Sequence, residues 1–359
     1  MSDFIITKLN KEDSRCLTFT VENIDVSVIN AIRRTLLTDI EVIVIDTSNE
    51  HCNIEKNTSR FTNEIIKHRL DCIPLRINDM DFPYDQYTLV SEKKNTSNHI
   101  EYVTTNDFKL VYNLNGKDIE KRELEKIFPK CEKTQMYEDV ARLRPKLSET
   151  LAGEELKFNC KLKKISAREN SCYNVVSKVA LSNTIDLNKS KEAWSEYKKT
   201  IVDKEQLDAE EKNWNIYNSQ RYFIDNSFNF IVESVGIYKP TDLIRLACKS
   251  LIKQVNQLEN NLKQNVLEIK ENNEHFPQGY DIYLTENDIT MGYLLQSILL
   301  KHYMNKVISY VGYNKAHPHD SFSILRIQLI GTDNTQISTM FLEAFQQLKD
   351  IFVHFSKQF

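Results

Sequence analysis

Glycine is scarce in this sequence. It occurs seven times in 359 residues, and no two glycines lie close together. A phosphate-binding loop or a dinucleotide-binding turn needs several glycines within a few residues, because the backbone must approach the ligand closely. The sequence also contains neither the GxSxG nor the HExxH pattern. These absences exclude the familiar nucleotide-binding, hydrolase and metalloprotease sites, and we expect no cofactor.

Paired cysteines are absent as well. The seven cysteines are an odd number, are widely spaced and form no CxC or CxxC pair, which argues against a disulfide framework and against a compact zinc site. His51 with Cys52 and His68 with Cys72 could supply four zinc ligands, but the first two are adjacent and would point apart. We therefore predict reduced thiols, mostly in the core, and no bound metal.

An excess of charge of one sign is also missing. Lys and Arg total 47 and Asp and Glu total 51, so a net charge of −4 gives no field that would hold a nucleic acid. No stretch approaches the roughly 20 apolar residues of a membrane-spanning helix. The first residues, MSDFIITKLN, carry no secretory signal. We expect an intracellular protein with no membrane segment and no direct sequence-specific contact with DNA.

An amphipathic helical pattern is present early in the chain. Apolar residues recur at steps of three and four between Val28 and Leu37, behind a capping residue that is either Asp25 or Ser27. This spacing leaves Arg33 and Arg34 together on the flank of the predicted helix. A pair of arginines on a helix flank is either a solvated surface or a contact for the carboxylates of a protein partner.

The composition changes along the chain. Residues 1–77 continue with a β-branched run at 41–46, which predicts a buried strand, and with helical spacing over 62–70. Polar and charged residues dominate 78–221, where short apolar runs predict a β-rich inserted domain. The alternating charges of 189–214 predict one solvated helix on its surface.

Two later segments carry heptad spacing. After Pro240, and again near the C-terminus, apolar residues step by 4, 3, 4, 3 and 4. A helix of this kind buries one narrow stripe against another helix, so we predict that the two segments pair. The stripe positions are Ile244, Cys248, Leu251, Val255, Leu258 and Leu262 in the first helix and Ile337, Phe341, Ala344, Leu348, Ile351 and Phe355 in the second.

A weak internal repeat links the two ends of the chain. INAIRRTLL at 29–37 aligns with MGYLLQSIL at 291–299, and each copy is followed later by one of the heptad helices. Two related halves suggest a fused pseudo-dimer, because equivalent surfaces can pack about a two-fold axis. The apolar residues that match are Ile32 with Leu294 and Leu36 with Ile298.

Linked motifs in both halves resemble one known family. INAIRRTLL, KNTS at 56–59 and HRLDCIPL at 68–75 resemble, in order and spacing, the alpha-type assembly subunits of multi-subunit DNA-directed RNA polymerases, such as bacterial alpha and its archaeal D-type counterpart. DITMGYLLQSILL at 288–300 and VGYNKAHPHDSFSILRIQL at 311–329 resemble their small partner of the archaeal L type. The chain resembles a fusion of both partners, similar to the fused subunit of African swine fever-type viruses.

The resemblance implies an α+β fold in which two alpha-like RNA polymerase dimerisation lobes form an intramolecular pseudo-dimer. The first lobe would be discontinuous, with 1–77 and 222–272, the second would be 276–359, and 78–221 would be the β-rich insert in the first lobe. The implied function is a non-catalytic assembly platform for DNA-templated transcription. The implied partners are the largest and second-largest polymerase subunits and a small zinc-binding subunit. A viral origin would place the protein in the host cytoplasm and the virion.

The resemblance also implies site residues, because relatives use the edge of the first helix to contact the second-largest subunit. The residues expected to dock the large subunits are Asn30, Arg33, Arg34, His68 and Arg69. The residues expected between the lobes are Ile32, Leu36, Leu251, Val255, Leu258, Leu262, Leu294, Ile298, Phe341, Leu348, Ile351 and Phe355.

Three positions depart from the family pattern. Asp71 replaces the usual glycine after HRL, so the turn there is either remodelled or keeps a left-handed conformation that Asp tolerates. Tyr293 and Gln296 replace the usual Asn and Arg of the small partner's helix. The polar contacts that these positions make in relatives are therefore not expected here.

Two other functions are compatible with parts of the sequence. A free-standing transcription regulator would bind DNA through the insert, where the basic run KLKK occupies 161–164, although a solvated face is the favoured interpretation of that run. A stand-alone nucleotidyltransferase would need a metal held by Asp79, Asp81 and Asp85. Because Pro83 lies within that segment, we interpret it as an acidic turn.

Overall fold

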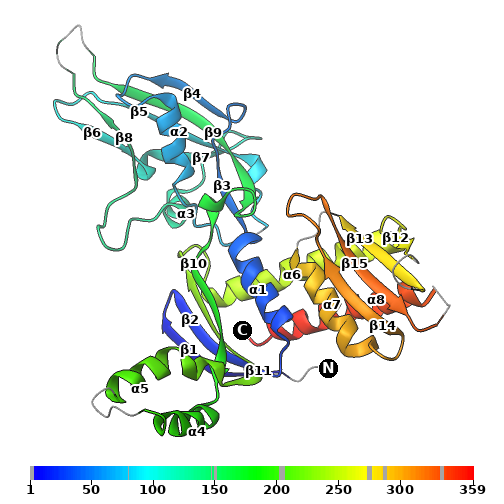
Figure 1. The fold of residues 1–359 in the computed structure, drawn as a ribbon. Helices are drawn as coiled ribbons and strands as arrows, with labels where there is room; N and C mark the ends of the chain where they lie inside the picture. The colour runs from blue at the N-terminus through cyan, green and yellow to red at the C-terminus, as the bar shows by residue number, and fades with distance from the viewer. Residues whose placement is uncertain are drawn as a thin grey trace. The chain divides into compact units, whose positions relative to one another are not determined.

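The computed structural model describes residues 4–79, 81–146, 148, 152–201, 207–272, 277–285, 289–331 and 335–359 (Figure 1). Phe276, the predicted start of the second lobe, and Asp288, the first residue of one motif, lie outside the described residues. The chain divides into two compact units. The first contains Met1–Ile40, Val176–Ser234 and Lys239–Phe359, and the second contains Glu41–Val175 and Val235–Tyr238.

The first unit contains two four-stranded antiparallel sheets of the same topology. Their strand orders are β1-β2-β11-β10 and β12-β13-β15-β14. Strands β1, β2, β11 and β10 of the first sheet therefore correspond, in this order, to strands β12, β13, β15 and β14 of the second sheet. The strands are β1 (Ile5–Asp13), β2 (Cys16–Glu22), β10 (Val176–Ile185), β11 (Phe223–Ser234), β12 (Glu268–Glu271), β13 (Gly279–Thr285), β14 (Ile308–Asn314) and β15 (Phe322–Leu329).

Each sheet carries two helices at the same places in the chain order. A first helix follows the second strand of each sheet, and a long helix follows the last strand. The internal repeat predicted from 29–37 and 291–299 is therefore present as two lobes of one architecture. The helices are α1 (Val26–Thr38) and α6 (Pro240–Lys263) in the first lobe, and α7 (Ile289–Tyr303) and α8 (Thr335–Ser356) in the second.

The first lobe has two insertions relative to the second. Residues Glu41–Val175, which form most of the second unit, are inserted between α1 and β10, where the second lobe passes directly from α7 to β14. A helical hairpin of α4 (Leu187–Lys198) and α5 (Leu207–Ile216) is inserted between β10 and β11, where the second lobe has only the turn at 315–321. Both insertions therefore lie in connections, which tolerate added chain better than strands or helices do.

The helical hairpin corrects the prediction of one solvated helix over 189–214. The structure has two helices there, and their aromatic side chains pack together: Trp194 and Trp214 have ring centroids 5.5 Å apart, and Tyr197 stacks on Trp214 at 5.3 Å. Trp214 is buried. The charge alternation that suggested a solvated helix did not reveal this contact, because the burial depends on residues from two helices.

The second unit is built around the long strand β9. Its main sheet has the order β3-β9-β5-β7, with β4 also pairing with β9, and a two-stranded sheet of β6 and β8 accompanies it. Phe108, Phe128 and Phe158 meet edge to face in its core. The elements are β3 (Glu41–Asp46), β4 (Cys52–Asn57), α2 (Asn63–Asp71), β5 (Tyr87–Lys94), β6 (Glu101–Thr104), β7 (Phe108–Tyr112), α3 (Lys121–Ile127), β8 (Asp139–Leu143) and β9 (Glu155–Ser166).

The packing places the boundaries of the units differently from the predicted domains. Residues 41–77 were expected in the first lobe, but β3 and β4 pair with β9 and so belong to the second unit. Residues 176–221 were expected in the insert, but β10 pairs with β11 in the first lobe. Strand pairing between distant segments set these boundaries, whereas the prediction followed changes in composition along the chain.

No helix in the described part of the chain combines enough length with enough apolar character to cross a bilayer.

Candidate docking and dimerisation surfaces

The two long helices form the centre of the contact between the lobes. Pro240 occupies the first turn of α6, where its missing N–H costs nothing, and the apolar positions of α6 then form one buried stripe. Helix α6 packs along α8, which confirms the predicted pairing of the heptad segments. The stripe residues Leu251, Val255, Leu258 and Leu262 of α6 and Phe341, Leu348 and Phe355 of α8 are all buried.

A charged contact accompanies the apolar stripe. Lys349 of α8 donates to Glu259 of α6 with an N–O distance of 2.7 Å, and Lys263, one turn along α6, contacts the same carboxylate at 2.6 Å. The hydrogen bonds from Lys263 and Lys349 lower the pKa of Glu259. The ion pair between Glu259 and Lys349 fixes the register of α6 against α8 next to the predicted stripe.

Ile351 is the one predicted stripe residue that is not buried. It is half-buried, whereas the neighbouring Phe352 has no exposed surface. A straight helix has 3.6 residues per turn, so its buried face drifts away from a strict heptad repeat toward the next residue. Phe345 is buried for the same reason and widens the stripe.

An aromatic cluster extends the contact between the lobes. Phe19 of β2 lies 6.3 Å from Phe355 and 4.9 Å from Phe359, measured between ring centroids, and Phe4 packs on Phe355 at 5.3 Å. The sheet of the first lobe thus packs against the last helix of the second lobe. Helical periodicity could not predict this contact, because it joins a strand to the opposite end of the chain.

Helix α1 is held on both sides. The carboxylate of Asp25 caps its N-terminus by accepting from the backbone N–H of Ser27 at 2.8 Å, so Asp25 is the capping residue. Helix α1 contacts α6 and α7, and its predicted interface residues Ile32 and Leu36 have no exposed surface. Helix α1 therefore contributes buried residues to the contact between the lobes and also lies at the edge of that contact.

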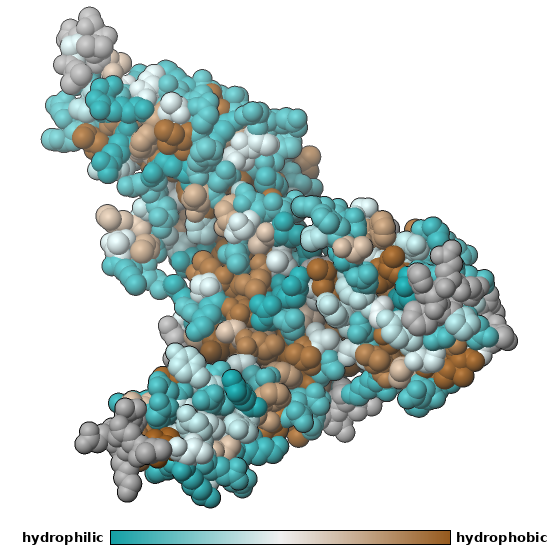
Figure 2. Space-filling view, in the orientation of Figure 1, coloured by the Kyte–Doolittle hydropathy of each residue, from teal (hydrophilic) through white to brown (hydrophobic). Residues whose placement is uncertain are grey.

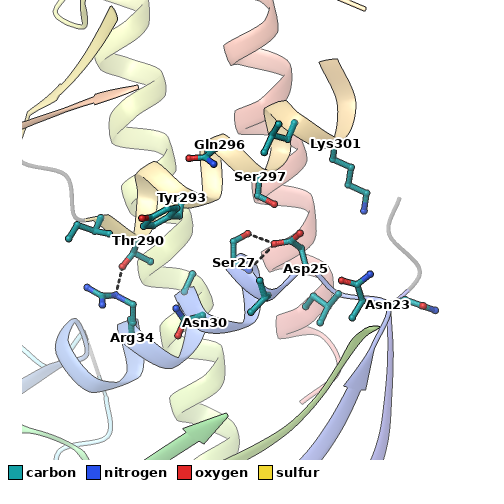
Figure 3. Close-up of a pocket in the computed structure, with 16 residues that line it drawn as sticks. Asn23, Asp25, Ser27, Asn30, Arg34, Thr290, Tyr293, Gln296, Ser297 and Lys301 are labelled. Atoms are coloured by element: carbon teal, nitrogen blue, oxygen red, sulfur yellow. Dashed lines mark hydrogen bonds between the residues drawn. The ribbon is translucent and has the colours of Figure 1, made fainter. Parts of the chain in front are cut away.

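The paired arginines of α1 are both half-buried but have different partners. Arg33 donates from Nε to the side chain of Asn30 at 2.8 Å, on its own helix. Arg34 donates from Nε to the hydroxyl of Thr290 in α7 at 2.7 Å, as Figure 3 shows. Arg34 therefore bridges the lobes, whereas Arg33 and Asn30 form a contact within one lobe.

A groove of about 810 Å³ lies between α1 and α7. In Figure 3, Ser27, Asn30 and Arg34 of α1 face Tyr293 and Ser297 of α7 across it. Four of the apolar side chains that line the groove remain well exposed, and Figure 2 shows apolar residues gathered along α1. These four are Val26 (53% exposed), Ile289 (38%), Tyr293 (51%) and Leu300 (40%).

Helix α7 packs closely on β14 in the second lobe. A Cβ atom on Gly292 would lie 2.1 Å from the ring of Tyr313, so the close approach requires glycine. Gln296 accepts from the backbone N–H of Tyr313 at 2.9 Å, and Tyr293 lies against the same ring at 5.2 Å. Gln296 and Tyr293, which depart from the family pattern, thus contact β14 within their own lobe. Leu294 and Ile298, which were expected between the lobes, are buried.

The second set of predicted docking residues lies on α2, in the second unit. His68 is exposed. Arg69 donates to the backbone carbonyls of Val140 at 2.7 Å and Asp139 at 2.6 Å, and its guanidinium lies over the ring of Phe61. Arg69 therefore anchors α2 to β8 although it is exposed, whereas His68 is exposed without such an anchoring role.

Asp71 adopts neither a left-handed conformation nor a turn. It is the last residue of α2, and its carboxylate accepts from the hydroxyls of Thr47 at 2.6 Å and Tyr173 at 3.0 Å. Of the two alternatives left open for this position, the remodelled backbone is the one present, since Asp71 has no positive φ. The family pattern has a glycine here, whose backbone is free to adopt many conformations. This chain instead has a carboxylate that forms two hydrogen bonds with segments distant in sequence.

The described residues contain no group of three or more His, Cys, Asp or Glu side chains that could hold a metal ion. Asp79, Asp81 and Asp85 are exposed, and Asp79 accepts from the backbone N–H of Asp81, as in an acidic turn. The candidate zinc ligand His51 instead contacts the carboxylate of Asp46 at 2.6 Å.

The basic run at 161–164 lies on β9 and is partly neutralised within the second unit. Lys163 contacts Asp46 at 3.2 Å, and Lys164 contacts Glu41 at 3.1 Å. A row of lysines that already contact carboxylates has little free charge to offer to a phosphate backbone. The geometry favours a structural role for this run.

Several residues of the groove were not predicted from the sequence. Thr290, Ser297 and Lys301 of α7 and Asn23 and Asn226 of the first lobe line it beside the predicted Asn30 and Arg34. The alignment of 29–37 with 291–299 contained the signal, since it places Ser297 opposite Thr35 and Gln296 opposite Arg34. That alignment predicted paired helices but not the polar residues that line the space between them.

Comparison with known proteins matches both lobes. Residues 18–255 and residues 280–358 each match the RNA polymerase Rpb3/Rpb11 dimerisation domain. The DNA-directed RNA polymerases I and III subunit rpac1 of Dictyostelium discoideum is 23% identical over 299 residues, which are 70% of this chain and 80% of that protein.

Shorter matches have higher identity. A conjugation stage-specific protein of Tetrahymena thermophila is 40% identical over 81 residues, which are 23% of this chain and 24% of that protein. The DNA-directed RNA polymerase subunit Rpo3 of Methanosphaera stadtmanae is 38% identical over 82 residues, which are 23% of this chain and 27% of that subunit. The match thus spans about a quarter of the length of these two relatives. Because one domain match covers more than half of the chain and a second covers its C-terminal lobe, this chain belongs to the RNA polymerase Rpb3/Rpb11 dimerisation-domain family and contains that domain twice.

Proposed function

We propose that this chain is a non-catalytic assembly subunit of a DNA-directed RNA polymerase. The observation that carries the proposal is that two lobes of one topology, each matching the Rpb3/Rpb11 dimerisation domain, pack on each other within one chain. Relatives named as polymerase subunits support it. The chain would supply a preformed dimer, and nucleotide addition would take place in the subunits that dock on it.

The groove between α1 and α7 is our proposed docking surface for a large subunit. It combines exposed apolar side chains with Asn30, Arg34 and Lys301, a mixture that suits a protein partner better than a small ligand. Half-buried arginines lose little further freedom on binding, and a guanidinium can pair with a partner carboxylate in two parallel hydrogen bonds. Exposed His68 on α2 is proposed as a second contact.

The test replaces Arg33 and Arg34 together with glutamate. Reversing the charge of Arg34, which lines the groove, and of the adjacent Arg33 should place like charges opposite the partner carboxylates and reduce capture of the two large subunits from a native lysate by at least tenfold. The yield of each large subunit on the tagged chain is measured by mass spectrometry. Arg33→Glu alone separates docking from lobe packing, because Arg33 hydrogen-bonds to Asn30 on its own helix, whereas Arg34 reaches Thr290 of the other lobe.

A matched control uses Lys198→Glu with Lys199→Glu. These are two adjacent, exposed basic residues at the end of α4, outside the groove, so the change in net charge is the same. The control should capture the large subunits normally. Normal capture by a folded Arg33/Arg34 double variant would show that the docking assignment is wrong.

The rival function, a free-standing regulator that binds DNA through the insert, predicts DNA binding that weakens steeply with salt. The paired lysines of β9 and the net charge of −4 argue against it. A partnership with a small zinc-binding polymerase subunit, and an origin of the African swine fever type with host cytoplasm and virion as locations, stay predictions from the resemblance of the motifs.

A further inference from the structure

Two buried cysteines of the second unit lie side by side. Cys52 begins β4, Cys160 lies on β9, and the two are direct partners in the antiparallel ladder. Their Sγ atoms are 2.8 Å apart, and both side chains are in the core, with 3% and 0% of their surface exposed. The proposed assembly function does not use them. Packing of the core alone does not require two thiols at paired positions of neighbouring strands.

The ladder geometry at this position suits a covalent link. The backbone N–H of Lys161 donates to the carbonyl of His51 at 2.9 Å, so that neighbouring pair is hydrogen-bonded. Hydrogen-bonded and non-hydrogen-bonded pairs alternate along an antiparallel ladder, which makes Cys52 and Cys160 a non-hydrogen-bonded pair. In such pairs the Cα atoms are about 4.5 Å apart and the side chains are closest, which lies within the range that disulfides span.

We propose that Cys52 and Cys160 are a redox modification site, at which hydrogen peroxide converts the two thiols into a reversible disulfide that links β4 to β9. The Cys52 sulfur attacks one peroxide oxygen, so an S–O bond forms, the O–O bond breaks, and the other oxygen leaves as water with the proton of Cys52. A sulfenic acid remains on Cys52. The Cys160 sulfur then attacks the Cys52 sulfur. An S–S bond forms, the S–O bond breaks, and the hydroxide leaves as a second water with the proton of Cys160. Two thiols are oxidised by two electrons, and one hydroperoxide is reduced.

The surroundings assign the two steps to different cysteines. Cys52 follows the turn after Asp46 and starts a strand whose ladder in the described residues is with β9, so opening of that strand end exposes its sulfur. The hydrogen bond with Cys160 and the charge of Lys67 lower the pKa of the Cys52 thiol, against the effect of burial. The hydrogen bond with Cys52 and burial raise the pKa of Cys160, which keeps its proton until the second step. A hydroperoxide is small and uncharged enough to reach a site of this kind.

The link would constrain the second unit. Strand β9 is the central strand of the main sheet and pairs with β3, β4 and β5. A bond between residues 108 positions apart closes a long loop in the unfolded chain, which stabilises the folded unit against unfolding. We therefore expect the oxidised chain to melt at a temperature several degrees higher than the reduced chain.

The experiment treats the purified full chain with hydrogen peroxide after removal of thiol reductant. Free thiols are then alkylated in denaturant, and the digest is mapped by mass spectrometry. The expected result is a linked peptide pair containing Cys52 and Cys160, which dithiothreitol separates. A matched control is the double variant Cys72→Ser with Cys172→Ser, which removes two exposed cysteines and should still form the link.

Cys160→Ala should abolish both the linked peptides and the rise in melting temperature. If the wild-type chain instead shows alkylated Cys52 and Cys160, a sulfinic acid on Cys52 without a link, or a disulfide between any other pair, the proposal is wrong. The wild-type peptide map decides this even if the Cys160 variant fails to fold.

Discussion

Among single residues, Asp46 joins three segments of the second unit. Its buried carboxylate lies at the end of β3 and contacts His51 at 2.6 Å, Lys163 of β9 at 3.2 Å and the backbone N–H of Ser48 at 3.2 Å. Burial acts to raise its pKa, but the hydrogen bonds from His51, Ser48 and Lys163 outweigh burial and lower the pKa to about 2. The charged form therefore stabilises the fold.

We predict a pH-dependent effect of Asp46→Asn. Because the folded pKa is below the ordinary value of 3.8, the carboxylate contributes its full stabilisation above about pH 4 and loses it as the pH falls toward 2. The variant should therefore be less stable than the wild type at pH 7 by on the order of 1 kcal/mol, and the difference should shrink below pH 4. Thermal melting followed by circular dichroism across this pH range measures the difference.

Asp85→Asn is the matched control, since it removes an exposed carboxylate from the same unit. Its melting temperature should follow that of the wild type at every pH. A constant difference between wild type and Asp46→Asn from pH 7 to pH 2 would show that the carboxylate charge is not the cause.

Among the secondary-structure elements, α6 and α8 pack together along a buried apolar stripe. Each buried Leu- or Phe-sized side chain contributes roughly 1.5 to 3 kcal/mol, so a stripe of six positions makes the pairing of the lobes strong. The contact is not a regular coiled coil along its whole length, because Phe352 replaces Ile351 in the buried face of α8.

Placing aspartate at Leu258 and Leu348 should therefore disrupt the first unit. Both leucines are buried, at 1% and 0% exposure, and removal of a buried leucine side chain alone costs about 2 to 5 kcal/mol. Two unpaired buried carboxylates cost more than this, so we expect the cooperative thermal transition of the first unit to disappear. Differential scanning calorimetry measures the transition.

Gln257→Asp is the control on the exposed side of the same helix. It introduces the same charge next to Leu258 and should leave the transition in place. An unchanged transition in the Leu258/Leu348 double variant would contradict the pairing of α6 with α8.

For the molecule as a whole, the important property is that both lobes are parts of one chain. Covalently linked partners meet at an effective concentration of about the millimolar range, so the pairing of the lobes does not depend on the protein concentration. The bulk of the added sequence enters through connections of the first lobe, as the second unit and the α4–α5 hairpin.

Cutting the chain between the lobes should convert the fold into a heterodimer. Co-expressed segments 1–266 and 267–359 keep each four-stranded sheet and its two helices within one segment, so they should purify together in a one-to-one ratio. Unlike the intact chain, the pair should dissociate on dilution, which analytical ultracentrifugation measures. Leu348→Asp in the short segment should prevent association, and folded segments that never associate would contradict the preformed interface.

Much of the fold could be predicted from local patterns. Heptad spacing predicted α6 and α8, the three- and four-residue steps predicted α1 and α2, and the repeat at 29–37 and 291–299 predicted two lobes. These features depend on residues close together in the chain, so the period of the apolar side chains reveals them.

Contacts between distant segments could not be predicted in this way. The partners of Asp71 are Thr47 and Tyr173, Phe19 packs on the C-terminal helix, and Trp194 packs on Trp214. The residues adjacent in sequence to each of these side chains form no pattern that predicts the contact.

The amino-acid sequence thus specified the helices, the repeated lobe and the family, because periodicity and motif order are properties of the linear chain. The folded structure was needed to assign β3 and β4 to the second unit, to bring Cys52 next to Cys160 and to form the groove between α1 and α7. Each of these depends on which strands and helices pair, and pairing is set by the packing energy of surfaces that meet only in three dimensions.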